Sequence, residues 1–536
     1  MPVKRKWIQG ICLVLIAVVL LTGCTGVDLN KFLRPEVVPF DEMEYARPDQ
    51  QEIADLAAAV AEDLETGASV EDLMDNVTLF LDAYDGFYTN YALANIYYCK
   101  DLTDSQWEEE YNLCLGMAAE VDALLDRMLY DLADCPLREE LESDAYFGQD
   151  FFDDYEGESL WDEGFTALME EEARLQSEYY ALSAQAQEMD MHSEAFYAGC
   201  GLEMAELFAE LVALRQEIAQ YVGYEDYLSF AYDFYYYRDY TPQQVQTLLE
   251  DIRQQLVPLY REAAESDIWM LAAQYSTQEQ TFAYTKNAAA AMGGIPAEAF
   301  ALLEEADLYD ISYSQNKYPA SFETYLYTYY EPYVFVNPTM GILDRLTFTH
   351  EFGHFCNDYA SYGSVAGIDV AEVFSQGMEY LSLCYGEDSK AMKKLKMLDG
   401  LCVYVEQAAY ASFEQQVYAL EAEELTAENI RRLYEQVGTD FGFDVWVWDS
   451  RSFVNITHFY TNPMYVISYV VSNDAALQLY EKEQEETGSG LKTFEENLTT
   501  QETYFLAFTE SAGLKSPFVE GRIEEVRQLL EDIIKH

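Results

Sequence analysis

The chain has 536 residues, half of them apolar, which is enough to bury a large core as one big unit or as two to three domains. Its 98 acidic and 30 basic residues give a formal net charge of −68 at pH 7. So negative a field excludes nucleic acid as a partner and would repel an anionic membrane surface.

The first 23 residues have the pattern of a secretory signal peptide. A basic start at residues 4–6 precedes an apolar stretch at residues 7–21, and a Leu-Thr-Gly-Cys tetrad ends at Cys24. The tetrad resembles a bacterial lipobox, which implies cleavage before Cys24 and attachment of lipid to its thiol. We therefore expect an extracytoplasmic, lipid-anchored bacterial protein. The alternative is an uncleaved N-terminal anchor, and with either the body of the protein lies outside the cytoplasm.

Residues 24–48 contain three prolines and are predicted to be a tether between the lipid and the folded part. Helical periodicity begins near residue 49 and continues to about residue 198, in segments such as Ile53–Leu64 and Glu108–Leu129. We expect an N-terminal helical lobe over residues 49–199 and a catalytic domain over residues 200–536. The seven cysteines of these two regions form no Cys-x-x-Cys pair and are expected to be small buried side chains, although up to three disulfides are possible.

One region, Phe322–Val336, has the composition of β-strands. Residues 324–327 and 333–336 are rich in aromatic and β-branched side chains, and Glu331-Pro332 between them is the candidate hairpin turn. Helices are expected again from Ile342 nearly to the C-terminus. The chain is therefore predicted to be mainly α, with a small sheet just before residue 350.

The segment from Thr349 to His354 reads Thr-His-Glu-Phe-Gly-His and holds two of the five histidines of the chain. On a helix, His350 and His354 lie one turn apart on the same face with Glu351 beside them, so both imidazoles can bind one metal ion. Two imidazoles leave a catalytic zinc ion short of a third protein ligand, because such a site uses three protein groups and keeps a fourth position for water.

The best source of the third ligand is a helix predicted to begin near Asp369 and to end near Gly386. It places Glu372, Ser375, Gln376 and Glu379 on one polar face. Glu372, in the first turn, can reach the metal, and Glu379, two turns later, can accept a hydrogen bond from a ligand histidine. The alternative is that Asp369 and Glu372 are a capping pair of this helix.

The His-Glu-Phe-Gly-His motif followed by Glu-x-x-Ser-Gln-x-x-Glu resembles the M3 family of zinc oligopeptidases, in particular its oligoendopeptidase F branch. Segments Glu210–Arg215, Arg238–Pro242, Pro332–Asn337 and Ala512–Phe518 also resemble family segments, so the likeness covers about residues 200–536. Residues 49–200 match the family only in helical character and acidity. The resemblance implies a bilobal, mainly α zincin metallopeptidase fold with a deep substrate cleft and a small β-sheet beside the HExxH helix.

The family resemblance also implies roles for individual residues. One zinc ion per chain would be bound by His350, His354 and Glu372, and Glu351 would be the general base. In the family a later group of histidine and tyrosine residues lines the opposite wall of the cleft. The matching segment here is Trp448–Val471, whose His458, Tyr465 and Tyr469 would donate to the oxyanion of the tetrahedral intermediate. Taken alone, His458 is more often a satisfied core histidine.

Two features depart from the family pattern. The link from His354 to Glu372 is shorter than is usual there, which affects the loop beside the cleft more than the ligands. The position three residues after His354, often another histidine in the family, is Asn357.

We therefore predict a zinc-dependent endopeptidase that hydrolyses short peptides and is held at the membrane only by the lipid on Cys24. The strand Tyr333–Val336 is predicted to bind the peptide backbone by edge pairing, which tolerates varied side chains. One alternative is a zinc carboxypeptidase of similar helical fold, such as the angiotensin-converting-enzyme-like or M32-like groups. Another is a lipoprotein that binds peptides without cleaving them.

Overall fold

A computed structural model describes residues 37–143, 145–155, 159–186, 193–363, 366–386, 389–444, 447–500 and 502–535. The predicted signal peptide, Cys24 and the tether up to residue 36 lie outside the described residues. The chain forms two compact units. The first runs to Ala173 and includes Tyr325–Glu331, and the second consists of Arg174–Thr324 and Pro332–His536. The division falls inside helix α7 (Glu163–Ala186), whereas the sequence suggested a boundary near residue 199.

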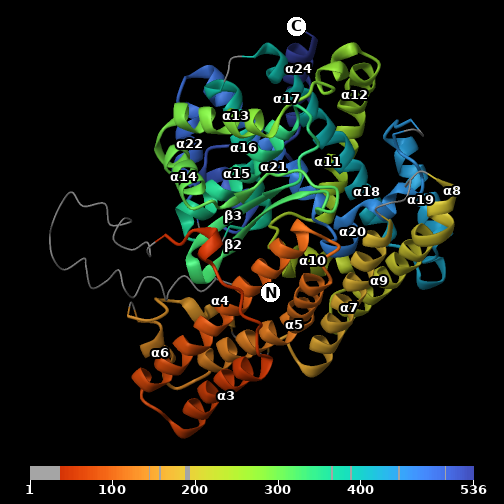
Figure 1. The fold of residues 1–536 in the computed structure, drawn as a ribbon. Coiled ribbons are helices and arrows are strands. Elements are labelled where there is room, and N and C mark those ends of the chain that lie inside the picture. Colours follow the sequence, from red (N-terminus) through yellow and green to blue (C-terminus); the bar gives the residue numbers. More distant parts are fainter. Residues whose placement is uncertain are drawn as a thin grey trace. The chain divides into compact units, whose positions relative to one another are not determined.

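Three long helices that pack against one another form most of the first unit (Figure 1). They are α3 (Gln50–Thr66), α4 (Val70–Lys100) and α5 (Ser105–Ala133), and the shorter elements are η1 (Phe40–Glu42), α6 (Arg138–Leu141), η2 (Phe151–Tyr155) and η5 (Tyr327–Tyr329). Asp49 caps α3 by accepting from the backbone N–H groups of Gln51 and Glu52, and Gly67 ends it in the left-handed conformation. The predicted helices over residues 53–64 and 108–129 are therefore confirmed.

Residues 40–46, near the end of the predicted tether, are part of this first unit. Phe40 and Met43 are buried. The backbone N–H of Ala46 donates to Asn90 Oδ1 at 2.7 Å, and the Tyr45 hydroxyl donates to Glu110 Oε2 at 2.7 Å. A free tether makes no such contacts, so residues 40–46 belong to the folded unit and not to the predicted tether.

The second unit is also mainly helical. Its helices, after the last part of α7, are α8 (Glu194–Phe196), η3 (Tyr197–Gly201), α9 (Leu202–Tyr221), α10 (Tyr227–Phe234), α11 (Pro242–Gln255), α12 (Val257–Ala264), η4 (Asp267–Leu271), α13 (Gln278–Met292), α14 (Gly294–Glu305), α15 (Asp344–Ser361), α16 (Ile368–Tyr385), α17 (Lys390–Cys402), η6 (Val403–Gln407), α18 (Ala408–Val417), η7 (Ala422–Glu424), α19 (Ala427–Asp440), η8 (Ser452–Asn455), α20 (Thr457–Thr461), α21 (Val466–Glu485), α22 (Ser489–Asn497), α23 (Phe505–Ser511) and α24 (Arg522–Lys535). Over the described residues, no helix is both long and apolar enough to cross a membrane.

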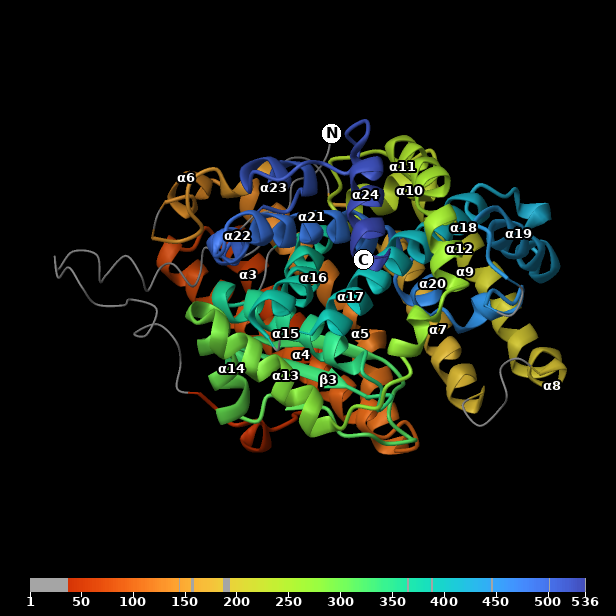
Figure 2. The same cartoon turned by 90° about the horizontal axis from the view of Figure 1, so that it is seen from above.

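Helix α16 lies at the centre of this unit, with α15 on one side and α21 on the other (Figure 2). Nearly every residue of α16 is buried, including the polar residues Asp369, Glu372, Ser375, Gln376 and Glu379. Buried polar groups need hydrogen-bond partners, so the polar face that the sequence shows on α16 must be satisfied from inside the protein. The partners come from α15, α17, the start of α21 and the segment between α10 and α11, and several of them belong to the candidate site described below.

The small sheet contains β1 (Tyr309–Asp310), β2 (Ser321–Leu326) and β3 (Glu331–Val336) in the order β1-β3-β2. β1 and β3 are parallel, with Tyr309 opposite Val334. The Ser321 hydroxyl donates to Glu351 Oε1 at 2.6 Å, so β2 begins beside the helix of the histidine motif. The predicted mainly α fold with a small sheet next to that helix is confirmed.

Two details of the predicted sheet are wrong. The hairpin turn is formed by η5 and Tyr330, whose φ of 56° is left-handed, and Glu331-Pro332 belongs to β3. Pro332 is the second residue of β3 and lies before Val334, where the pairing with β1 begins, so its missing N–H removes no hydrogen bond to β1. β3 is also the middle strand, so it has no free edge for a peptide. The sequence did not predict β1, because a strand of two residues is too short to show the alternation of apolar and polar side chains.

All seven cysteines in the described part of the chain are free thiols. Cys99, Cys114 and Cys356 are buried and the other four are half-buried.

Candidate active site

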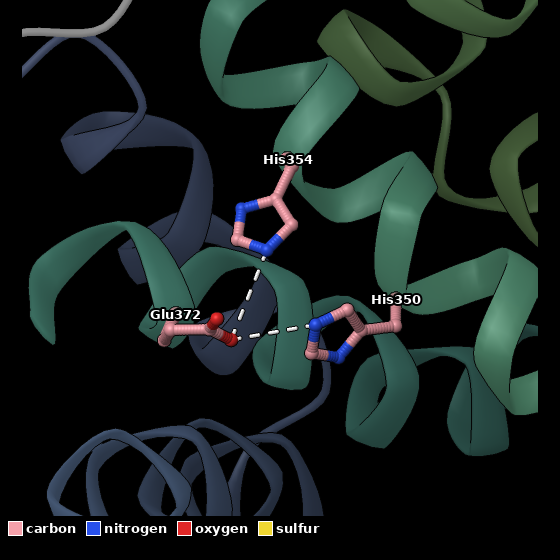
Figure 3. A group of neighbouring side chains, drawn as sticks. All are labelled: His350, His354 and Glu372. Carbon is pink, nitrogen blue, oxygen red and sulfur yellow. Dashed lines mark ion pairs between the residues drawn. The ribbon is translucent and has the colours of Figure 1, made fainter. Parts of the chain in front are cut away.

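The three predicted metal ligands converge in the second unit (Figure 3). His350 and His354 extend from α15 and Glu372 from the first turn of α16. Glu372 Oε2 lies 3.3 Å from His350 Nε2 and 3.7 Å from His354 Nε2. One donor atom from each residue lies within 4.8 Å of the others. Two imidazole nitrogens and a carboxylate oxygen are the donor set of a catalytic zinc site, so the residues fit this ion.

Gly353, inside the histidine motif, allows α15 and α16 to approach closely enough for this arrangement. A Cβ atom at position 353 would lie 2.5 Å from the carbonyl oxygen of Phe374 and 2.5 Å from the Cα atom of Ser375. Backbone atoms cannot give way as a flexible side chain does. The glycine is therefore required by packing, and it brings Glu372 within reach of both histidines.

The capping role considered for Asp369 and Glu372 is wrong. The N-cap of α16 is Gly367, and no side chain caps the helix. Asp369 instead forms an ion pair with Arg238, with Oδ2 at 3.2 Å from Nε, and accepts from the Tyr240 hydroxyl at 2.6 Å. The carboxylate at the start of α16 thus binds side chains that are distant in the sequence.

The environment of Glu372 keeps it ionised. Its Oε1 accepts from the Tyr465 hydroxyl at 2.6 Å and its Oε2 from the Ser375 hydroxyl at 2.8 Å. Burial alone would raise its pKa, but His354, His350 and Tyr465 together hold the pKa at about 2. Burial lowers the pKa of His354 to about 4, so this imidazole is a free base with a lone pair for a metal.

The pKa of His350 is shifted in the opposite direction to that of His354. Burial opposes its charged form, but Glu372 and Glu379 outweigh burial and raise its pKa well above the ordinary value. Its Nδ1 lies 2.8 Å from Glu379 Oε1, the contact predicted for a carboxylate that supports a ligand histidine. The site therefore stabilises positive charge at the point where the three donors meet, as a cation site must.

Glu379 is itself bound by a buried lysine that the sequence did not reveal. Lys396 Nζ, on α17, lies 2.8 Å from Glu379 Oε2 and 2.9 Å from Asp399 Oδ2, and the residue is 1 % exposed. Burial would raise the pKa of Glu379, but the charge of Lys396 and the contact with His350 lower it. Lys396 follows three other lysines within α17, and the spacing does not distinguish it from exposed ones.

Glu351 is nearly buried and faces the edge of the sheet. Burial, with the nearby charges of Glu372 and Glu379, raises its pKa to about 7 against the opposing effects of His350 and Ser321. Ser321 was also missed by sequence reasoning, because it becomes a neighbour of Glu351 only through the pairing of β2 with β3.

His458, Tyr465 and Tyr469 lie together next to Glu372. The His458 ring stacks on that of Tyr465 at 5.0 Å between centroids, and the Tyr469 hydroxyl lies 3.3 Å from His458 Nε2. Burial lowers the pKa of His458. Its Nδ1 is buried and has no hydrogen-bond partner among the described residues, which does not match a satisfied core histidine.

Asn357 has a structural contact. Its side-chain amide donates to the backbone carbonyl of Leu498 at 2.7 Å, which ties α15 to the segment after α22. Within the short link from His354 to Glu372 noted in the sequence, α15 ends at its C-cap Tyr362, which has a φ of 56°, and α16 begins after Gly367. A Cβ atom on Gly367 would lie 2.2 Å from the Thr503 carbonyl oxygen, so Gly367 lies directly against the backbone of Thr503.

Residues 40–159 match the family model of the peptidase M3 N-terminal domain. No curated protein matches the chain. Among solved structures, the chain is similar to a proposed oligoendopeptidase F, with a TM-score of 0.79 and 19% identity over 93% of this chain and 99% of that chain. PZ peptidase A with an inhibitor has a TM-score of 0.78 and 18% identity over 92% of this chain and 99% of that chain. A proposed oligoendopeptidase F from Bacillus anthracis has a TM-score of 0.76 and 19% identity over 94% of this chain and 99% of that chain.

The chain therefore carries the N-terminal domain of the M3 peptidases and has the fold of oligoendopeptidase F, and the family resemblance seen in the sequence is confirmed. One part of that prediction was wrong: residues 49–200 were expected to match the family only in helical character and acidity, but residues 40–159 match its N-terminal model. A helical bundle depends on the pattern of apolar residues and not on short motifs, so no single segment showed the likeness.

Proposed function

We propose that the chain is a zinc-dependent endopeptidase that hydrolyses short peptides. The observation that carries this proposal is the convergence of His350, His354 and Glu372, with Glu351 beside them on the same helix. A zinc ion held by these three side chains would polarise the scissile carbonyl and lower the pKa of the water that attacks it. The fold shared with oligoendopeptidase F supports the same conclusion.

In this proposal Glu351 accepts the proton of the attacking water and passes it to the leaving amine. Its carboxylate is suited to this because Ser321 holds one oxygen by a hydrogen bond of 2.6 Å, which fixes the orientation of the group. Glu379, which is itself held by Lys396, binds the Nδ1 of His350, so that the Nε2 of His350 faces the other ligands.

The two tyrosines of the opposite wall have different roles. Tyr465 donates to Glu372 and so orients a ligand. The Tyr469 hydroxyl lies 3.3 Å from His458 Nε2, and this pair is the better source of hydrogen bonds to the oxyanion of the tetrahedral intermediate.

The peptide backbone is proposed to pair with β2 and not with β3. β2 is an edge strand of the described sheet and begins at Ser321, the residue that holds Glu351. Edge pairing reads the backbone, so the enzyme would accept peptides of varied sequence.

The contacts favour an endopeptidase over a carboxypeptidase. A carboxypeptidase needs a cation to bind the terminal carboxylate of its substrate. Two buried cations of this region, Arg238 and Lys396, are already paired with Asp369 and with Glu379. A third, Arg215, donates to the backbone carbonyls of Phe459 and Tyr460. For the location, we propose export and attachment through lipid on Cys24, on the strength of the N-terminal sequence.

The experiment is cleavage mapping by mass spectrometry on two mixed peptide pools, one whose members carry a C-terminal amide and one whose members have a free C-terminus. The zinc-loaded protein should cut interior bonds, and a chelator should abolish the cuts until zinc is added back. Removal of residues only from unblocked C-termini would identify a carboxypeptidase. Peptides that remain bound and intact would identify a binding protein.

A further inference from the structure

The turn that leads into Tyr465 has a backbone conformation that L-residues rarely adopt. Met464 has a φ of 67°, in the left-handed region, although it is not a glycine. It is also buried, at 2 % exposure. Such a residue persists only where its surroundings determine the conformation, and these cases concentrate at functional sites.

Both backbone polar groups of Met464 are held by buried side chains, those of Glu414 and Arg238. Its N–H donates to Glu414 Oε1, on α18, at 2.8 Å. Its carbonyl accepts from Arg238 Nη2 at 2.9 Å. The carbonyl of the preceding Pro463 accepts from the Tyr236 hydroxyl at 2.6 Å. The turn over residues 462–465 is therefore fixed by side chains from two other parts of the unit.

Arg238 also reaches the helix that carries Glu372. Its Nε lies 3.2 Å from Asp369 Oδ2 and its Nη2 3.3 Å from Asp369 Oδ1, one helical turn before Glu372. The same Nη2 donates to Ser468 at 3.0 Å. The guanidinium is packed against the rings of Tyr232 and Tyr236, 4.4 and 4.3 Å from their centroids, which keeps its plane fixed.

One guanidinium thus bonds the turn before Tyr465 and the first turn of α16. These two elements meet at the candidate site, where the Tyr465 hydroxyl donates to Glu372 Oε1 at 2.6 Å. We propose that Arg238 is a positioning residue, which holds the 462–465 turn against α16 and thereby sets the hydrogen bond from Tyr465 to Glu372. The effect of Arg238 on metal binding rests on the proposed function. The contacts by which Arg238 holds the 462–465 turn against α16, called the clamp below, do not.

A lysine cannot replace Arg238 in this role. The contacts to Met464, Asp369 and Ser468 use the planar fork of the guanidinium, whereas an ammonium is a point charge on a flexible stem. The Arg238→Lys variant keeps the positive charge and removes the planar fork of N–H donors. A second variant, Tyr236→Phe, removes only the hydroxyl that binds Pro463 and keeps the ring.

The test has two readouts on the full chain. Hydrogen exchange of the metal-free protein should show faster exchange in residues 462–469 in Arg238→Lys, and a smaller increase in Tyr236→Phe. Zinc affinity, measured by competition with a chromophoric chelator, should fall about 10-fold in Arg238→Lys and in Tyr465→Phe. The zinc affinity of the double variant should be at most about twofold lower than that of either single variant, because both changes remove the same hydrogen bond.

The control is Arg522→Lys. Arg522 forms a buried ion pair with Asp474 at 2.9 Å, further along α21, and touches none of the site residues. This variant should lose stability without a change in zinc affinity or in exchange of residues 462–469.

Unchanged exchange in that segment, or zinc affinities that fall additively to about 100-fold in the double variant, would overturn the proposal. A protein that shows the clamp and binds zinc but leaves every peptide intact would refute the proposed function and keep the role of Arg238. If the wild type binds no zinc, hydrogen exchange in residues 462–469 alone decides whether Arg238 holds the turn.

Discussion

The hydrogen bond between Glu379 and His350 can be tested by the Glu379→Gln substitution. In the wild type, Oε1 lies 2.8 Å from His350 Nδ1 and Oε2 lies 2.8 Å from Lys396 Nζ. Both neighbours donate, and a carboxylate has two acceptor oxygens for them. An amide has only one, so glutamine must turn its NH₂ group toward either His350 or Lys396.

The expected effect is a weaker metal site in a less stable protein. Loss of the partner of a ligand histidine costs roughly 10- to 100-fold in metal affinity, which is about 1.4 to 2.7 kcal/mol. Leaving a buried charge without its partner costs about 3 to 5 kcal/mol. Lys396 keeps Asp399 at 2.9 Å, so the loss in the free energy of unfolding should be below that range.

Zinc affinity is measured by competition with a chromophoric chelator, and stability by urea denaturation of the metal-free proteins. The matched control is Glu483→Gln. Glu483 is also a buried carboxylate, and it accepts from the backbone N–H groups of Gly488, Gly490 and Leu491 away from the histidines. The control should lose stability and keep its zinc affinity. Equal zinc affinity in Glu379→Gln and wild type, or an equal fall in the control, would refute the reasoning.

Three further predictions concern other parts of the protein. Gly353→Ala should lower the free energy of unfolding by about 1 to 3 kcal/mol, because its Cβ would lie 2.5 Å from the Phe374 carbonyl oxygen; an unchanged melting temperature would contradict the close approach. Tyr469→Phe should lower kcat by about 10² to 10³ with unchanged zinc affinity, whereas Tyr465→Phe should weaken zinc binding; steady-state kinetics and chelator competition would expose the reverse pattern. Cys24→Ala should abolish lipid labelling and move the protein from the detergent to the aqueous phase, and continued partition into detergent would argue against a lipoprotein.

The local features of the site could be predicted from the sequence. Apolar periodicity and the residues Asp49 and Gly386 indicated where helices begin and end, because capping is an interaction between residues close in the chain. The spacing of His350 and His354 placed both on one helical face. The polar face of α16 then suggested Glu372 and Glu379, and the structure brings both against His350.

The long-range partners could not be predicted in this way. Asp369 was considered as a local cap, but its partner Arg238 is 131 residues away in the sequence. Ser321 meets Glu351 only because β2 pairs with β3, and β3 became the middle strand through the two residues of β1. Lys396 has the same sequence surroundings as an exposed lysine. These contacts depend on which faces of distant helices and strands pack together.

The most direct test of the central claim compares zinc content and peptide hydrolysis in the wild type and in Glu351→Gln. Glu351 is proposed to move the proton and not to bind the metal. Both proteins should therefore hold one zinc ion per chain, and the variant should hydrolyse peptides at least about 100-fold more slowly. A variant that cleaves as fast as the wild type, or a wild type that binds no zinc, would contradict the proposed function.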